Sequence, residues 1–506
     1  MTAQWMTGMR WIGPLRMAFV GSLLLSFLAL QGSLINRDGI FYVDAARALL
    51  EPAAGISGTS FDWQFLSLLM AGLSVLTGLA PETAGHLLNA LLLAGTCCLL
   101  VAIVRRRLPQ AAWAACLVVL AMPAYNGYRN ELLREYGFWF FCTLSFWLAM
   151  RWQEAPRWRE AIACQLALGI AVLFRLEAVA FFAALMLWQA FAAPAGQRVR
   201  RVLMMGCVPL AGGTLAAAFF WTGVLPVPDR VTNYLVAANP LRTLQILNEA
   251  GSRMSEHVFP FKYSREEAGF ILFFGLLSVI PVKFLKMAGV FVVPLAYAVV
   301  ANPVRVALAR WQPLPWAFLA YLLVLAAFVT HQFFLVGRYV SLLNLLAVPV
   351  AAAGFALLMQ RFPRWKWLMV ALALLTMAAN VVSFSPRKTH IVEAGRWLGA
   401  NAHDAARVGV DNARLAYYAG WRASQAVSLD RAALGAALAQ KRIDMAVFEV
   451  SRKDADVEAW LAERGLKGVR RFANKAGDAV IVAVPVPAQA RPSITERSRS
   501  NTASME

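Results

Sequence analysis

Charged residues are scarce in this sequence, and acidic ones are scarcest. Asp, Glu, Lys and Arg make up 15% of its 506 residues, with 28 acidic side chains against 48 basic ones. Soluble globular domains have about 25% charged residues. The 60% hydrophobic share is too large for one buried core, and its runs are long enough to span lipid. The composition therefore excludes an ordinary soluble enzyme and predicts a polytopic α-helical membrane protein.

The shortage of acidic residues leaves a formal net charge of +20, which also suits a nucleic-acid-binding protein. The position of the charges argues against that class. Most arginines lie in short clusters between apolar runs, as the positive-inside rule requires of cytoplasmic loops. We therefore expect no nucleic-acid partner.

Cysteine is absent from the polar parts of the chain. All six cysteines fall inside apolar segments: Cys97, Cys98, Cys116, Cys142, Cys164 and Cys207. A disulfide framework or a cysteine-based zinc site outside the membrane is therefore excluded.

Apolar runs and Arg clusters together predict about eleven membrane crossings. Arg10 and Arg16 precede the first run, 17–35, so the N-terminus is expected in the cytoplasm of a bacterium and the first run is expected to stay as a signal anchor. The other predicted crossings are 84–104, 111–125, 136–150, 161–174, 176–192, 202–224, 287–301, 316–330, 340–358 and 367–384. Parity of the Arg clusters leaves the runs 65–79 and 269–282 at the interface.

The composition changes after Pro386. Helical spacing in 393–400 and 454–463, and β-branched runs at 408–410, 445–450 and 479–484, predict a small α/β domain. The topology puts it on the periplasmic face of the inner membrane. The predicted domains are thus a membrane domain, 1–385, a periplasmic α/β domain, 386–486, and a disordered polar tail, 487–506.

The segment after the first run carries the most informative carboxylate. Asp38 follows Arg37 and precedes apolar residues at helical spacing, so a short helix is expected along the membrane surface. A carboxylate at the bilayer edge is suited to take a proton from an acceptor hydroxyl. Asp directly before a helix is also a common N-cap, and the residues alone leave both interpretations open.

Charged side chains also gather at three later boundaries. Arg129, Glu131, Arg134 and Glu135 lie at helical spacings and can neutralise one another. Arg175 and Glu177 interrupt an apolar stretch and can form a structural ion pair.

Arg338, before Tyr339, can extend to lipid headgroups or hold a phosphate with a geometry that Lys lacks. The long loop 225–267 adds His257, Lys262 and Arg265, either as phosphate or acceptor contacts or as solvated surface.

The order of these motifs resembles the GT-C glycosyltransferases, in particular bacterial members similar to protein mannosyltransferases and to the aminoarabinose transferase of lipid A. The resemblance starts with Asp38-Gly39-x-x-Tyr42 and Phe61-Asp62-Trp63-Gln64-Phe65 and continues to the C-terminal domain. It implies a GT-C fold with interfacial helices in the first external loop. It also implies Asp38 as the catalytic base and Asp62 as a second acidic residue.

The same resemblance implies that Arg129, Arg134, Arg175 or Arg338 binds the donor phosphate. Arg175-Leu176-Glu177 is similar to an Arg-Pro-Glu-Gly turn of the family, and Arg338-Tyr339 to its late Arg-Tyr pair. Arg37, Tyr42, Glu131, Glu135, His257, Lys262 and Tyr339 are further candidates for the site.

A site outside the cytoplasm has no nucleotide sugars, so the expected donor is a sugar on a polyprenyl phosphate such as undecaprenyl phosphate. Displacement predicts inversion, and the acceptor is a periplasmic glycan, lipid or protein. No spacing demands a cofactor; a divalent metal, Mg or Mn, would use Asp38, Asp62 or Glu131. The alternatives are an O-antigen polymerase or ligase, expected to have a larger late external loop, and a transporter, expected to show internal repeats.

Overall fold

The computed structural model describes residues 13–51, 63–222, 232–233, 236, 239–301, 309–382, 387–402, 404–422, 425–454 and 456–486. The chain divides into two compact units. The membrane unit comprises Met1–Gln31 and Asp62–Ser383, and the C-terminal unit comprises Gly32–Phe61 and Phe384–Glu506. Two predictions fall outside the described residues: the role of Asp62 and the disorder of the tail 487–506.

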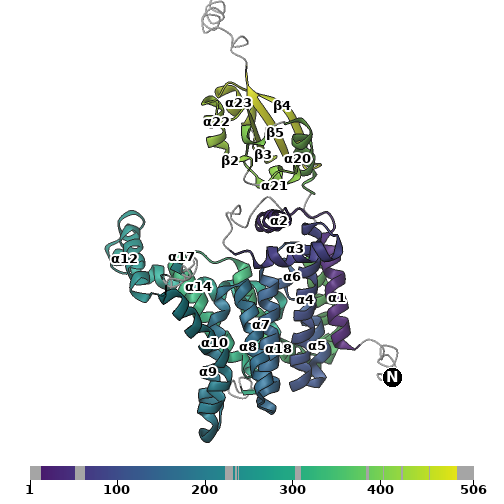
Figure 1. Ribbon diagram of the computed structural model, residues 1–506, viewed down its shortest axis with the longest axis vertical. Helices are drawn as coiled ribbons and strands as arrows, with labels where there is room; N and C mark the ends of the chain where they lie inside the picture. The colour runs from purple at the N-terminus through teal and green to yellow at the C-terminus, as the bar shows by residue number, and fades with distance from the viewer. Residues whose placement is uncertain are drawn as a thin grey trace, which may run out of the picture. The chain divides into compact units, whose positions relative to one another are not determined.

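The membrane unit is helical, and Figure 1 shows α1, α4, α5, α7 and α8 side by side in a bundle. Its first helices are α1 (Pro14–Leu30), α3 (Phe65–Thr77), α4 (Pro81–Arg107), α5 (Ala112–Ala121), α6 (Pro123–Asn126), α7 (Glu135–Glu154) and α8 (Trp158–Phe174). There follow α9 (Val179–Ala192), α10 (Arg198–Trp221), α12 (Pro240–His257), α13 (Lys262–Glu266), α14 (Ala268–Ala288), α15 (Val292–Ala301), α17 (Leu314–Gln332), α18 (Gly337–Arg361) and α19 (Lys366–Val381). Short 3₁₀ turns join several of these helices.

Five helical segments among the described residues are long and apolar enough to cross a membrane: Pro81–Arg107, Ala195–Phe219, Ala268–Ala301, Leu314–Gln332 and Gly337–Arg361. Shorter apolar helices add Pro14–Leu30, Phe65–Thr77, Pro109–Ala121 and Leu176–Ala192. These helices make the chain a multi-pass membrane protein. The predicted number of about eleven crossings is not confirmed by helix length.

The helices differ from the sequence prediction at three places. Helix α1 ends at Leu30, so the first run does not continue as a helix to Ile35. The runs predicted as an interfacial helix and a separate crossing join in one candidate span, Ala268–Ala301. The long loop that was predicted to be external contains α12, an amphipathic helix that packs against α14 and α17.

Close helix packing in the membrane unit depends on small residues, as in other helical membrane proteins. Gly354 of α18 faces the backbone of α15, and a Cβ built there would lie 1.9 Å from the carbonyl oxygen of Pro294. Any larger residue at position 354 would therefore push the two helices apart. Helix α18 is also the most buried of the candidate spans, since 72% of its most apolar stretch is buried in the structure.

The C-terminal unit contains a five-stranded sheet in the order β2-β1-β3-β5-β4. Strands β1 (Val408–Val410), β2 (Val427–Ser428) and β3 (Met445–Val450) are parallel, whereas β5 (Ala479–Pro485) is antiparallel to both β3 and β4 (Leu466–Ala473). The helices of this unit are α2 (Arg37–Leu50), α20 (Thr389–Asn401), α21 (Ala413–Tyr418), α22 (Arg431–Ala439) and α23 (Val457–Glu463). The predicted α/β type of this region is confirmed.

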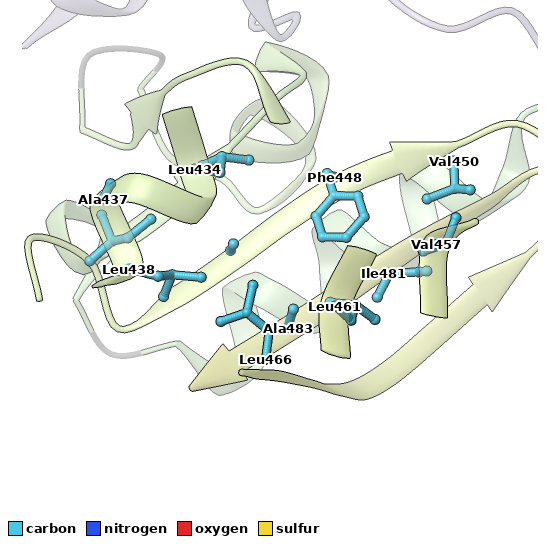
Figure 2. Packing of buried hydrophobic residues seen from close by; sticks show 12 residues of the cluster. Leu434, Ala437, Leu438, Phe448, Val450, Val457, Leu461, Leu466, Ile481 and Ala483 are labelled. Atoms are coloured by element: carbon cyan, nitrogen blue, oxygen red, sulfur yellow. The ribbon is translucent and has the colours of Figure 1, made fainter. Parts of the chain in front are cut away.

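Alternate residues of the central strands cover opposite faces, as the two-residue period of a strand requires. Phe448 of β3 and Ile481 of β5 pack with α22 and α23 on one face, shown in Figure 2. Val447 and Val482 pack with α20 and α21 on the other. The sheet is thus a central layer with helices on both sides.

Helix α2 is the short helix predicted after the first run, and the structure groups it with the C-terminal residues. Its N-cap position is Asn36, so Asp38 is not the cap. Asp38 instead lies in the first turn, where a carboxylate interacts favourably with the helix dipole. Asp38 therefore does not lie directly at the end of the first span, because the chain leaves α1 at Leu30 and starts a new helix at Arg37.

Candidate active site

Four charged side chains meet at the ends of helices in the membrane unit. Glu135 opens α7, Arg175 is the C-cap of α8, Glu177 lies in the 3₁₀ turn before α9, and Arg338 is the second residue of α18. An acidic residue at a helix N-terminus and a basic residue at a C-terminus both suit the helix dipole. Because α7 and α8 run antiparallel, the start of one and the end of the other lie at the same end of the bundle.

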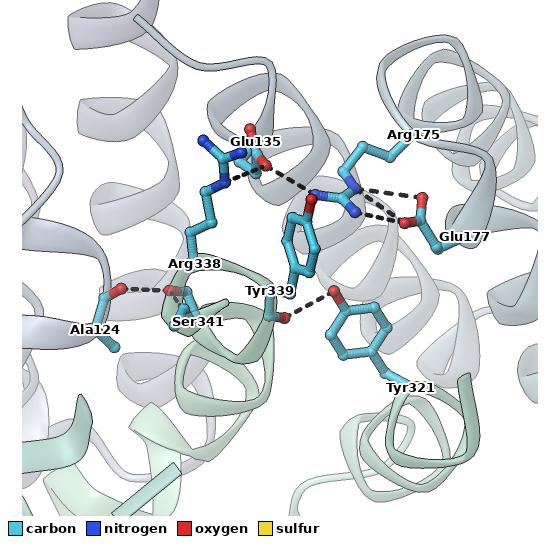
Figure 3. A network of polar contacts seen from close by, with 9 residues as sticks. Ala124, Glu135, Arg175, Glu177, Tyr321, Arg338, Tyr339 and Ser341 are labelled. Atoms are coloured by element: carbon cyan, nitrogen blue, oxygen red, sulfur yellow. Dashed lines mark hydrogen bonds and ion pairs between the residues drawn. The ribbon is translucent and has the colours of Figure 1, made fainter. Parts of the chain in front are cut away.

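Glu135 is the centre of this network (Figure 3). Its Oε1 accepts a hydrogen bond of 2.8 Å from Nη1 of Arg175 and lies 3.5 Å from Nε of Arg338. Arg175 also donates from Nε to both carboxylate oxygens of Glu177, at 3.2 Å each. Two carboxylates and two guanidinium groups therefore compensate one another at a place where isolated charges would be costly.

Aromatic and backbone groups hold the two arginines in place. The guanidinium carbon of Arg175 lies 4.4 Å from the ring centre of Tyr339, and that of Arg338 lies 5.6 Å from it. The carbonyl of Tyr339 accepts a 2.9 Å hydrogen bond from the hydroxyl of Tyr321. These cation–π contacts and the hydrogen bond fix the first turn of α18, which carries Arg338, against α7, α8 and α17.

Exposure distinguishes the two arginines of the network. The side chain of Arg175 is 4% exposed and contacts both carboxylates, whereas that of Arg338 is 19% exposed and contacts Glu135. The 3.5 Å separation from Glu135 is longer than a normal hydrogen bond. Arg338 is therefore the cation of this network that an incoming anion can approach.

Arg129 occupies a different place from the one predicted for a phosphate ligand. Its Nη1 donates to the Oγ atoms of Ser22 and Ser26 of α1, at 3.0 and 2.7 Å, and its Nε donates to Asn126 at 2.9 Å. The residue is 4% exposed. These contacts join α1 to the segment before α7, which favours a structural role for Arg129. The alternative in which the charges of residues 129–135 neutralise one another is wrong for Glu135, which pairs with Arg175 and Arg338 instead.

The remaining candidates of the membrane unit are dispersed. Arg134 is the half-buried N-cap residue of α7, and Glu131 is half-buried before it. In the long loop, exposed Lys262 lies 3.8 Å from Glu266, and exposed His257 contacts the carbonyl of Arg253 through Nδ1. Among these four residues, Arg134 is connected with the Glu135 network: it precedes Glu135 in the chain, and its charge attracts that of Glu177.

Arg37, Asp38 and Tyr42 belong to α2 of the C-terminal unit. Tyr42 is buried, Asp38 is half-buried and Arg37 is exposed. The other acidic candidate, Asp62, lies outside the described residues. Within the part of the chain that the structure describes, no three His, Cys, Asp or Glu side chains come together as a metal site.

Similarity to known proteins is confined to structure. No family model matches the sequence, and no curated protein matches it. The apo oligosaccharyltransferase of Archaeoglobus fulgidus has 11% identity and a TM-score of 0.52, over 90% of this chain and 71% of that one. The chain has a GT-C fold.

ArnT of Cupriavidus metallidurans is also similar, with lower TM-scores. Its apo structure has 14% identity and a TM-score of 0.43, covering 92% of this chain and 97% of that one. Its structure bound to undecaprenyl phosphate has 16% identity and a TM-score of 0.41, covering 94% and 98%. The oligosaccharyltransferase match confirms the predicted resemblance to GT-C glycosyltransferases at the level of the fold.

Two features of this GT-C membrane unit were missed in the sequence. Glu135 is among the predicted site residues, but its spacing points to neighbours in the chain as partners, whereas its actual partners lie 40 or more residues away. Ser22 and Ser26, which hold Arg129, were not singled out. Their spacing of four residues on an otherwise apolar helix is the pattern that could have identified them, because it puts two hydroxyls on one face.

Proposed function

We propose that the chain is a membrane glycosyltransferase that moves a sugar from a polyprenyl-phosphate donor to a periplasmic glycan, lipid or protein. The GT-C fold supports the reaction class. The observation that carries the proposal is Arg338, a partly exposed guanidinium held by Glu135 and Tyr339 at the end of a buried charge network. Such a group suits the phosphate of a lipid whose chain stays in the bilayer.

In the proposed reaction, an acceptor hydroxyl attacks the anomeric carbon of the donor sugar. The bond between that carbon and the phosphate oxygen breaks, with inversion, and the polyprenyl phosphate leaves with the electron pair. Asp38 is the proposed base that takes the hydroxyl proton. Arg338 is proposed to stabilise the negative charge that develops on the phosphate.

Glu135 and Arg175 have a supporting role in this proposal. Glu135 orients the guanidinium of Arg338, and Arg175 balances the second charge of the carboxylates. Removing either would disturb the phosphate site through Arg338 rather than by direct contact with the substrate. Arg134 remains a proposed second phosphate ligand, because it precedes Glu135 at the same helix end.

Binding of undecaprenyl phosphate to the full chain in nanodiscs tests the phosphate site. Arg338→Ala is expected to weaken this binding by about ten- to a hundredfold, because a hydrogen bond to a charged group contributes roughly 1.5–3 kcal/mol. Arg361→Ala is the matched control, since Arg361 is exposed at the other end of the same helix. Equal binding by the Arg338 variant and the wild type would remove the proposed phosphate site.

Transfer itself is tested in cells by mass spectrometry of surface glycans, lipids and glycoproteins, with and without the gene. Asp38→Asn is expected to abolish the sugar-dependent mass difference at normal membrane expression. Asp44→Asn, on the same helix and paired with Arg47 at 3.8 Å, is the control and should keep most of the product. Full product from the Asp38 variant would remove Asp38 as the base.

The same experiment separates the alternatives. A polymerase or ligase would change the length or attachment of whole glycan chains, whereas a monosaccharide transferase changes the mass by one sugar. A transporter would leave the chemistry of the acceptor unchanged and be insensitive to Asp38→Asn.

A further inference from the structure

The segment that carries Asp38 is held by side chains of the C-terminal domain, which begins more than 330 residues later. Ile35 shows this most directly, because α21 side chains bind both of its backbone polar groups. The backbone N–H of Ile35 donates to the hydroxyl of Tyr418 at 3.2 Å, and its carbonyl accepts from Nε of Arg414 at 2.7 Å. Ile35 is 2% exposed, so these bonds satisfy backbone groups that water does not reach freely.

The short helix α21 has two faces with different partners. Leu415 and Ala416 point into the apolar cluster of the C-terminal domain. Tyr418 also packs on this cluster, and its hydroxyl reaches Ile35. Arg414 and Tyr417, three residues apart, lie on another face and contact Ile35 and Arg47. Helix α21, which meets α2, therefore connects the sheet to the segment that carries Asp38.

Contacts continue along α2 to its end. The guanidinium carbon of Arg47 lies 5.1 Å from the ring centre of Tyr417. Glu51, which caps the C-terminus of α2, forms an ion pair with Arg422. Before the helix, Leu34 packs on the apolar cluster that contains Leu415.

From these contacts we infer that Arg414 and Tyr418 are positioning residues for Asp38. They fix the backbone three residues before Asp38, and Arg47 and Arg422 fix the remainder of α2. The C-terminal domain therefore sets the position of the proposed base, and its sheet and helices form a rigid support for α2. This inference rests on the proposed function, because it assumes that Asp38 acts in transfer.

The physical basis is the cost of misplacing a catalytic group. A displacement of about 1 Å can lower a rate by roughly a hundredfold. Asp38 lies in the first turn of a helix of 14 residues whose entry is held by two hydrogen bonds. If these bonds are removed, the first turn of α2 frays and the carboxylate samples many positions.

The first experiment measures hydrogen exchange of residues 34–51 in the full chain in nanodiscs. Arg414→Ala is expected to raise the exchange rate of this segment by about tenfold or more, and Tyr418→Phe, which removes one hydroxyl, by a smaller factor. Arg407→Ala is the matched control, since Arg407 pairs with Asp444 within the same domain. Unchanged exchange in both variants would overturn the inference.

The second experiment compares undecaprenyl phosphate binding with transfer in cells. Both variants are expected to bind undecaprenyl phosphate as the wild type does and to form at least about tenfold less product. A general folding defect would lower both quantities together. If Arg414→Ala does not accumulate in membranes, Tyr418→Phe gives the same comparison; normal transfer despite raised exchange would overturn the positioning role.

A charge reversal gives the third experiment. Arg422→Glu or Glu51→Arg alone is expected to raise exchange at the C-terminal end of α2, and the double variant is expected to restore it, because only the orientation of the ion pair has changed. Failure of the double variant to restore protection would remove this pair from the inference.

Failure of the proposed function would look different. In that case Asp38→Asn would retain transfer, and exchange of residues 34–51 would still show whether the C-terminal domain holds the segment. Retained transfer by Asp38→Asn would overturn the positioning role of Arg414 and Tyr418, but it would leave their measured effect on exchange as evidence for docking alone.

Discussion

A buried carboxylate of the membrane unit and a half-buried one of the C-terminal unit have different surroundings. Glu135 of the membrane unit lies among two guanidinium groups, so its charge is compensated by side chains. Asp411 of the C-terminal unit, directly after β1, accepts the backbone N–H of Glu449 at 2.8 Å and has the carboxylate of Glu449 nearby. Burial raises the pKa of Asp411 to about 6, an effect that the backbone hydrogen bond opposes and the charge of Glu449 strengthens.

The comparison shows that burial alone does not decide the state of a carboxylate. A buried carboxylate between cations can orient another charged group, as Glu135 does with Arg338. One without sufficient compensation becomes a group that titrates near neutral pH. The first suits a phosphate site, and the second makes the stability of a domain depend on pH.

The largest effect is expected when the centre of the buried network is removed. Glu135→Ala leaves Arg175 and Arg338 without their shared carboxylate and is expected to lower the free energy of unfolding by about 3–5 kcal/mol. Titration with SDS in mixed micelles measures this quantity. Glu177→Ala is the matched variant and should cost less, because Glu177 pairs with Arg175 alone among the described ion pairs. The reverse order would contradict the central position of Glu135.

A smaller effect on stability and a clear effect on binding are expected for Arg338→Lys. Lysine keeps the positive charge near Glu135 but lacks the planar fork that binds phosphate through two N–H groups. We expect stability close to the wild type and undecaprenyl phosphate binding weakened by about tenfold. Calorimetric titration in nanodiscs measures the binding, and wild-type affinity would show that the fork is not used.

Asp411→Asn should reveal the pH dependence of the C-terminal unit. The pKa of Asp411 is raised in the folded state, so the unfolded chain loses this proton first, and stability falls as the pH rises from about 4 to about 6. Asn removes this penalty and is expected to stabilise the unit by up to about 3 kcal/mol at pH 7, with no gain below pH 4. Hydrogen exchange of β1 and β3 in the full chain, corrected for the intrinsic rate at each pH, measures the gain.

A carboxylate whose pKa is lowered provides the counterpart. Glu449 is held by hydrogen bonds from Lys388 and Asn412, which lower its pKa although burial opposes them. Its contribution to stability is present above its unfolded pKa and is lost as the pH falls through its lower folded pKa. A gain from Asp411→Asn that stayed constant across the whole pH range would contradict the assigned titration.

The smallest effect is expected at the surface of the same domain. Arg407 and Asp444 form an exposed ion pair, and exposed pairs contribute little to stability. Arg407→Ala should leave the melting temperature of the full chain unchanged within error, at low and at high salt. A large fall in the melting temperature would mean that the exposure of an ion pair does not indicate how much it contributes to the stability of this protein.

Much of the fold follows from the order of residues. The runs of apolar residues predicted most helices, and strands 408–410 and 445–450 have the limits expected from their β-branched residues. Strands β2 and β4 were missed: β2 has only two residues, and β4 carries exposed basic side chains such as Arg470 and Arg471 that hide its period. The start of α2 could not be predicted, because α1 ends at Leu30 although the apolar run continues beyond it.

The sequence by itself determined a membrane protein with a small α/β domain. It also identified Arg175, Glu177 and Arg338 as charged residues within or beside apolar segments, where charges are costly unless they have a partner. Only the tertiary structure decided that Glu135 joins them, that Arg129 is held by α1, and that the Asp38 segment belongs with the C-terminal domain. The physical reason is that helix and strand formation depend on spacing over a few residues. Ion pairs and docking join groups that are far apart in the chain, and these can be recognised only once the helices have packed.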